Sequence, residues 1–227
     1  MIPPRPFRRI DRRAARLASA LALAGAALGG CRSAYYSTME TFGVEKRDIL
    51  VDRVEEGKES QADAQEQFQT TLERFRSISG VDLGELEDRY RKFESAYEDC
   101  EAEAEDVRDR IESIETVAKD LFREWESEIE EISSSDLQRR SRESFRETTK
   151  RYEQLIAAMH RAADKMDPVL VAFKDQVLFL KHGLNARAIS ALDETVEGIE
   201  SDVERLIAEM QASIREADAF IGSLQGA

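Results

Sequence analysis

The residue types that most often carry enzyme chemistry are few and scattered in this chain of 227 residues. Its two histidines, His160 and His182, and its two cysteines, Cys31 and Cys100, form no cluster of the kind that holds zinc or haem. The sequence contains neither a phosphate-binding loop ending in Gly-Lys-Ser/Thr nor a Gly-x-Ser-x-Gly nucleophile elbow. We therefore expect a protein that is not an enzyme and has no catalytic residue, metal site or cofactor.

The remaining reactive groups fit structural roles. Glu101 and Glu105 lie four residues apart, at helical spacing, among other charged residues. This pattern is typical of a solvated helix surface rather than an acid–base site. Cys100 lies within an apolar seam, where a small buried hydrophobe is the expected role and a reactive thiol is the alternative. His182 precedes a turn, where it would interact with a helix C-terminus.

One long apolar seam organises the chain between Leu83 and Trp125. Its residues follow one another at alternating steps of three and four, the period that keeps one side of a helix against partner helices. The members of the seam are Leu83, Leu86, Tyr90, Phe93, Tyr97, Cys100, Ala104, Val107, Ile111, Ile114, Ala118, Leu121 and Trp125. The large aromatic residues in the seam suit the core of a bundle better than a simple two-stranded coil.

Similar seams predict four helices, separated by short turns at 79–82, 133–136 and 182–185. In these turns Gly80 and Gly183 would end a helix, Ser133, Ser134 and Ser135 offer capping side chains, and Asn185 would cap the last helix. Short turns make consecutive helices antiparallel, so the predicted fold is all-α, an elongated antiparallel bundle of about four long helices. Pro168 is expected to kink the third helix or split it in two. In the first helix, Gly57 would be explained by a close approach of another helix, and Gln61 is a polar exception. The expected helices cover 48–78, 83–132, 133–182 and 186–224.

The first thirty residues resemble an export signal. Six arginines precede an almost wholly Leu, Ala and Gly run at 17–28, and Leu28-Gly29-Gly30-Cys31 resembles a bacterial lipobox. We expect residues 1–30 to be a lipoprotein signal peptide that is removed, leaving an acylated Cys31; the alternative is a signal anchor with a chance cysteine. Residues 31–47 would be a tether whose aromatic residues rest at the membrane interface or cap the bundle. The single bundle domain would cover 48–227.

The net charge of the chain argues against nucleic acid as a partner. Removing residues 1–30 takes away six Arg and one Asp and changes the net charge from −14 to −19. Such an acidic chain is not expected to bind nucleic acid, whose phosphates need concentrated Lys and Arg. Arg32 is not the Asp that retains lipoproteins in the inner membrane, so we expect a lipid-anchored protein on the periplasmic face of the outer membrane.

Three segments together resemble a known family. They are Ser33–Tyr36 with Val44–Val54, Phe173–His182 with Leu184–Ile189, and Glu216–Ile221. The sequence resembles the bacterial lipoprotein family catalogued as domain of unknown function 2959, over nearly the whole mature chain. The resemblance implies a Gram-negative envelope protein and agrees with the lipobox at Cys31. It brings no known reaction, ligand or catalytic residue.

The predicted function is that of a non-enzymatic envelope lipoprotein, a helical spacer or adaptor for another envelope component. The alternative is a bundle that binds a hydrophobic or lipid ligand. Residues 169–180 are apolar around more than one side of the third helix, so a single core stripe cannot use them all. Either the first and fourth helices bury the excess, or the excess forms a partner-docking surface at Leu178, Phe179, Lys181 and His182.

Overall fold

The structure is a computed structural model and describes residues 46–78, 84–183 and 186–225. The chain divides into two compact units, and the description below concerns the second unit, Arg47–Ala227. Throughout the described residues all regular structure is helical, which confirms the predicted all-α fold. The helices are α3 (Lys46–Arg76), α4 (Leu86–Glu131), α5 (Ser135–His182) and α6 (Ala186–Gln225).

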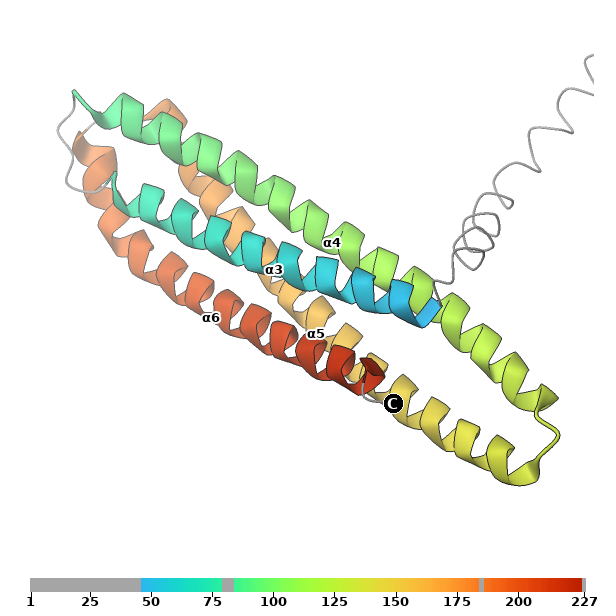
Figure 1. Cartoon of the computed structure of the whole chain (residues 1–227). Coiled ribbons are helices and arrows are strands. Elements are labelled where there is room, and N and C mark those ends of the chain that lie inside the picture. Colours follow the sequence, from blue (N-terminus) through green and yellow to red (C-terminus); the bar gives the residue numbers. More distant parts are fainter. Residues whose placement is uncertain (1–45, 79–83, 184–185, 226–227) are drawn as a thin grey trace, which may run out of the picture. The chain divides into compact units, whose positions relative to one another are not determined.

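The four helices form a bundle in which consecutive helices run in opposite directions (Figure 1). The backbone of α5 closely approaches those of α4 and α6. Side chains connect α3 to its neighbours: Arg110 of α4 lies 3.0 Å from Glu56, and Lys58 donates to Asp218 of α6 at 2.9 Å. These ion pairs are partly exposed and add little stability individually, but they define the register of the helices.

The heptad seam is the buried side of α4 along most of its length. Helix α4 begins at Leu86, and the seam residues from Leu86 to Ala118 are buried. Leu121 and Trp125, at the end of the predicted seam, are only half-buried. Leu83 lies outside the described residues.

Aromatic rings from three helices pack in the interior of the bundle, near the end where α3 and α5 end and α4 begins. The ring of Phe173 in α5 lies 6.5 Å from that of Phe68 in α3 and packs edge-on, at 5.9 Å, against Phe93 in α4. Phe93 in turn lies 5.1 Å from Phe75 in α3. All four side chains are fully buried. This cluster accounts for the bulky residues that the sequence places in the seams, because three helices are needed to cover them.

Gly57 marks a crowded point on α3. A Cβ atom at this position would lie 2.8 Å from Cδ1 of Ile114 and 3.0 Å from Cε of Met159. Two neighbouring helices therefore place side chains where a larger residue would project. This contact explains a glycine in the interior of a helix despite its poor helix propensity.

Helix α5 is continuous from Ser135 to His182, so of the two alternatives predicted for Pro168 the split is wrong and the kink stays a prediction. Pro168 is exposed, whereas Met166 and Val169 on either side are buried in the bundle. The carbonyl group that loses its hydrogen bond to the proline therefore lies on the solvent side of the helix. Burial of the flanking residues holds the helix together across this position.

The ends of α5 agree with the predicted boundary residues. The side chain of Ser134 caps the helix by accepting a hydrogen bond from the backbone N–H of Leu137 at 3.5 Å. Gly183 ends it, with its N–H donating to the carbonyl oxygen of Leu180 at 3.1 Å. The other predicted turn residues, Gly80 and Asn185 among them, lie outside the described residues.

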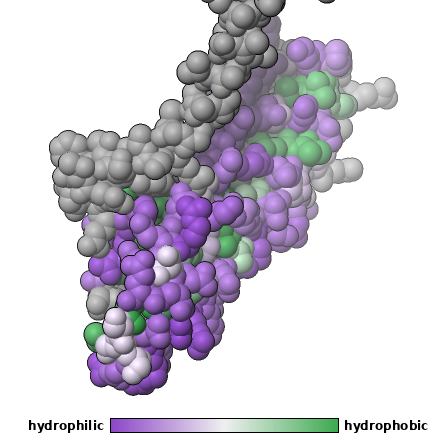
Figure 2. All heavy atoms as spheres, turned by 90° about the vertical axis from the view of Figure 1, so that its right-hand side faces the viewer, coloured by the Kyte–Doolittle hydropathy of each residue, from purple (hydrophilic) through white to green (hydrophobic). Residues whose placement is uncertain are grey.

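Helices α4 and α5 extend beyond the start of α3 and the end of α6 (Figure 1). In this extension, Phe145 packs edge-on against Phe122 at 5.9 Å and Trp125 at 5.5 Å, and the Trp125 indole N–H donates to Ser141 at 3.2 Å. These rings are only half-buried, because two helices rather than four surround them. Figure 2, which views the bundle from this end, shows mainly hydrophilic side chains on its described surface.

Candidate interaction surfaces

The end of α5 exposes large apolar side chains on the side opposite its core stripe. Val171 is 57% exposed, Leu178 48% and Phe179 47%. The intervening core residues Phe173 and Val177 are buried. The first and last helices of the bundle therefore do not bury these three residues, and the first alternative drawn from the sequence is wrong for them. That a partner docks here stays a prediction.

Charged groups of both signs adjoin this apolar surface, because the exposed Asp175 lies on the same side of α5 as Val171 and Leu178, and basic side chains lie beside them. The Lys181 ammonium lies 4.0 Å from the Glu94 carboxylate on α4, at the outer limit of an ion pair. Lys174 and His182 are exposed, and His182 ends α5, where a basic side chain interacts favourably with the helix dipole. The side chain of Arg187, the other cation expected here, lies outside the described residues.

This surface lies at one end of the bundle. Figure 1 shows that α3 and α5 end, and α6 begins, at the same end. The start of α3, the turn between α4 and α5, and the end of α6 lie towards the opposite end. The structure therefore separates the C-terminal part of α5 from the start of α3 by most of the bundle's length, as the alternating helix directions predict.

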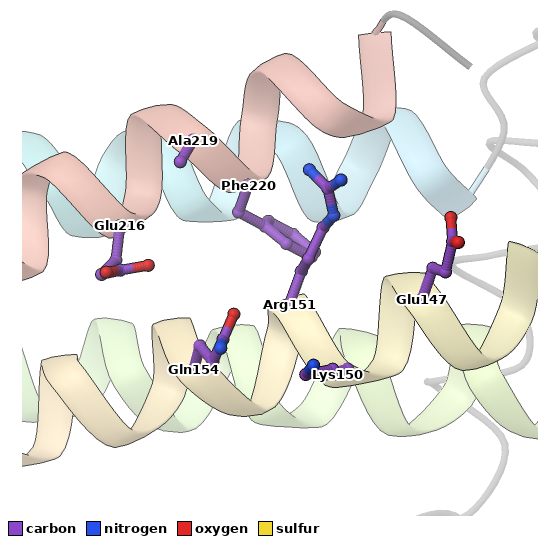
Figure 3. Close-up of a pocket in the computed structure, with 7 residues that line it drawn as sticks. All are labelled: Glu147, Lys150, Arg151, Gln154, Glu216, Ala219 and Phe220. Atoms are coloured by element: carbon purple, nitrogen blue, oxygen red, sulfur yellow. The ribbon is translucent and has the colours of Figure 1, made fainter.

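A groove lies between α5 and α6 (Figure 3). Its volume is about 370 Å³, and Phe220 of α6 points towards α5 at its floor. The rim combines two acidic and two basic side chains with an amide. The lining residues are Glu147, Lys150, Arg151, Gln154, Glu216, Ala219 and Phe220. The lining residues include no hydroxyl or thiol group.

Two further hollows also lie on the surface and are lined mainly by charged side chains. One, of about 450 Å³, lies between α4 and α5, where Nε2 of His160 is 2.9 Å from a carboxylate oxygen of Glu115. The other, of about 670 Å³, lies near the start of α5 and is lined by Arg139, Arg142 and Arg146 among others. Neither is an enclosed apolar cavity of the kind expected for a hydrophobic ligand. In the part of the chain that the structure describes, no three His, Cys, Asp or Glu side chains are arranged to hold a metal ion.

Cys100 is fully buried, in agreement with its expected role as a small apolar residue. The hydroxyl group of Thr71 donates to its sulfur at 3.3 Å. Burial raises the pKa of the Cys100 thiol to about 12, so the thiolate needed for reaction with electrophiles is rare at neutral pH.

The remaining predicted site lies at the N-terminus. Cys31 and the tether aromatics Tyr35, Tyr36 and Phe42 fall outside the described residues. Among the residues that are described, no helix combines the length and the apolarity needed to cross a membrane.

Sequence reasoning missed one feature of the core. Ser213 of α6 lies in line with the apolar residues Met210 and Ala217, but its hydroxyl is buried and, among the described residues, has no hydrogen-bond partner. A polar residue within an apolar seam, as at Gln61, is the sequence signal that could have indicated this buried polar group.

Comparison with curated proteins gives no match. Residues 35–224 match the model of the family described as protein of unknown function (DUF2959), which covers all four described helices. The match spans most of the chain and agrees with the resemblance of the three sequence segments. The chain belongs to the DUF2959 family.

Proposed function

We propose that this chain is a non-enzymatic, lipid-anchored adaptor of the Gram-negative envelope, held by acylated Cys31 on the periplasmic face of the outer membrane. The lipobox-like sequence and Arg32 support the anchor and its location. The bundle acts as a spacer, which holds a docking surface at a distance from the lipid. The observation that carries the proposal is the exposed apolar surface at the end of α5, formed by Val171, Leu178 and Phe179.

The chemistry of this surface supports one kind of partner. Lys174, Lys181 and His182, together with the carboxylate of Asp175, adjoin the exposed apolar side chains, although the whole chain carries a net charge of −14. A complementary partner is an envelope protein with an apolar contact surface bordered by carboxylates. Rim charges of this kind mainly accelerate association and select the partner, whereas the apolar contact supplies most of the affinity.

The bundle core favours an adaptor over a carrier of hydrophobic ligands. Aromatic rings from α3, α4 and α5 fill the interior near the end where α3 and α5 end, and the hollows described above are open to solvent and lined mainly by charged side chains. A ligand carrier would instead need an apolar cavity that encloses most of its ligand.

The test is in-cell photocrosslinking of the full-length protein with a photoreactive residue at Lys174, followed by identification of the crosslinked protein. Leu178→Ser and Phe179→Ser should each abolish or strongly reduce the crosslink while helix content stays unchanged by circular dichroism. Leu137→Ser is the matched control, because Leu137 is 58% exposed but lies at the start of α5. This control should crosslink like the wild type.

Three outcomes would overturn docking at this surface. One is crosslinking that persists in both Leu178→Ser and Phe179→Ser. Another is a crosslinked product with the mass of two copies of this chain, which would indicate self-association rather than an adaptor. The third is unfolding of both variants, which would show that the two side chains support the core.

A further inference from the structure

Basic side chains are concentrated on the first part of α5. Residues 135–151 contain six Lys or Arg and three Asp or Glu, a net charge of +3 in a chain whose net charge is −14. Arg139, Arg142, Arg146 and Lys150 follow one another at steps of three and four residues, so they lie along one side of the helix. All four side chains are exposed. These four residues are called the basic stripe below.

Three residues of the basic stripe line the hollow of about 670 Å³ at the start of α5. Arg139, Arg142 and Arg146 present guanidinium groups there. A guanidinium group can donate two parallel hydrogen bonds to a phosphate group, and it stays charged throughout the physiological pH range. Glu143 and Glu147 are the acidic residues of the lining, so the lining has more positive than negative side chains.

Ion pairs leave part of the positive charge of the basic stripe uncompensated. Arg139 pairs with Asp136, and Arg142 lies 2.7 Å from the carboxylate of Glu130 on α4. Both pairs are well exposed to solvent, so each is weak and an external anion can compete for the arginine. Among the described residues, no ion pair joins Arg146 or Lys150 to a carboxylate.

The glutamates at the end of α4 lie largely on another side of the bundle. Glu124 and Glu131 follow Arg110 by two and three heptads, and Arg110 pairs with a carboxylate of α3. Their side chains therefore lie on the side of α4 that is turned towards α3 and away from α5. Glu130, with Glu126 four residues before it, lies towards α5, and Glu130 is the α4 carboxylate that pairs with the basic stripe.

The basic stripe lies towards the end of the bundle at which α3 begins (Figure 1). If Cys31 is acylated, fifteen residues, 31–45, join the lipid to the first residue of α3. Such a segment can be at most about 50 Å long, whereas α5, with 48 residues, is about 70 Å long. The anchor would therefore hold the end with the basic stripe near the bilayer, rather than the end with the apolar docking surface.

We infer that the basic stripe binds the phosphate groups of anionic phospholipids at a membrane surface, so that the start of α5 lies against the lipid. The choice of a membrane as the partner rests on the proposed lipid anchor, whereas the charge complementarity does not. A basic residue near an anionic membrane raises partitioning about fivefold, within about one Debye length of the surface. The basic stripe alone therefore binds weakly, and the anchor makes the contact effective by holding it close to the lipid.

Vesicle sedimentation of the mature chain with Cys31→Ser, which cannot be acylated at this position, tests the inference. Vesicles of phosphatidylcholine alone are compared with vesicles of equal parts phosphatidylcholine and phosphatidylglycerol. At about 0.1 M salt the chain should sediment with the anionic vesicles only, and at about 1 M salt it should stay in solution. Absence of binding at the lower salt concentration, or equal binding to both kinds of vesicle, would overturn the inference.

Two triple variants separate the basic stripe from the overall charge of the chain. The first carries Arg139→Gln, Arg142→Gln and Arg146→Gln. The matched control removes the same charge from exposed positions elsewhere, with Arg91→Gln, Lys92→Gln and Lys165→Gln. The first variant should bind anionic vesicles about tenfold more weakly or less than that, whereas the control should bind like the wild type. An equal loss in both variants, or no loss in the first, would contradict a site at the basic stripe.

The one tryptophan of the chain reports which end touches the vesicle. Trp125 lies beside the basic stripe, because its indole N–H donates to Ser141 at 3.2 Å. Phospholipids with a nitroxide on the headgroup should therefore quench Trp125 fluorescence when the chain binds, and binding without quenching would show that another surface is used. A chain that binds anionic vesicles in this way but is not acylated at Cys31 in cells would remove the proposed anchor and leave the lipid site. An acylated chain that fails to bind them would leave the anchor and overturn this inference.

Discussion

Replacing Phe173 by Ala should be among the most destabilising single changes in the bundle. Its ring is fully buried and contacts Phe68 of α3 and Phe93 of α4, so one side chain connects three helices. Removing a buried phenylalanine loses the transfer free energy of the ring and leaves a cavity, at a cost of about 3–5 kcal/mol. A domain is stable by about 5–15 kcal/mol, so this change should remove a large part of the total.

Phe145→Ala is the matched comparison. It is the same substitution on the same helix, but Phe145 is only half-buried and packs against Phe122 and Trp125 in the two-helix extension. The lost apolar burial is smaller and water can enter the space, so we expect a loss of about 1–2 kcal/mol.

Urea unfolding of both variants and the wild type, followed by circular dichroism at the helix band, measures the two losses. The slope of unfolding free energy with urea should stay constant, so that the midpoint reports stability. Equal losses for Phe173→Ala and Phe145→Ala would refute the distinction between a four-helix core and a partly exposed extension. So would a loss below about 1 kcal/mol for Phe173→Ala, since surface substitutions have effects of this size.

Three further predictions concern chemistry. Metabolic labelling with a fatty-acid analogue should mark the wild type and not Cys31→Ser; equal labelling of both would contradict acylation at Cys31. Cys100 should react slowly with a thiol reagent at pH 8 until urea unfolds the protein, because the folded state raises the pKa of its thiol to about 12. For the same reason, the contribution of this thiol to the free energy of unfolding should be present below about pH 9 and decline as the pH rises towards 12. Purified mature protein should neither hydrolyse ATP nor bind duplex DNA; saturable, metal-dependent turnover would disprove the first and a salt-sensitive gel shift the second.

The periodicity of the sequence predicts the helices well, because each helix is stabilised mainly by burying one stripe of apolar residues. The seam of α4 illustrates this from Leu86 to Ala118, where the structure buries the predicted residues. The seam cannot show how many helices cover each part, which is why Trp125 looks like a core residue in the sequence but is only half-buried in the structure. Pro168 does not split α5 for a related reason: the free energy lost with its missing hydrogen bond depends on whether the proline lies on the buried or the exposed side of the helix.

The candidate surfaces could be predicted only in part. The excess of apolar residues near the end of α5 is visible in the sequence, but which of them are exposed depends on the rotation of α5 relative to α4 and α6. That rotation places Val171 and Leu178 outwards and Phe173 inwards. The unpaired state of Gln61 and Ser213 depends on neighbours from all four helices, so no single segment reveals it.

The alternating directions of the helices also determine how the bundle would respond to mechanical load. A pull between the start of α3 and the end of α5 acts parallel to the helix axes, because these two helices run in the same direction and the two points lie at opposite ends. Such a pull loads the contacts of α3 in shear: Lys58–Asp218 and Arg76–Glu200, far apart along the helix, resist sliding at the same time. A pull across the bundle would instead break the same contacts one after another, and at lower force.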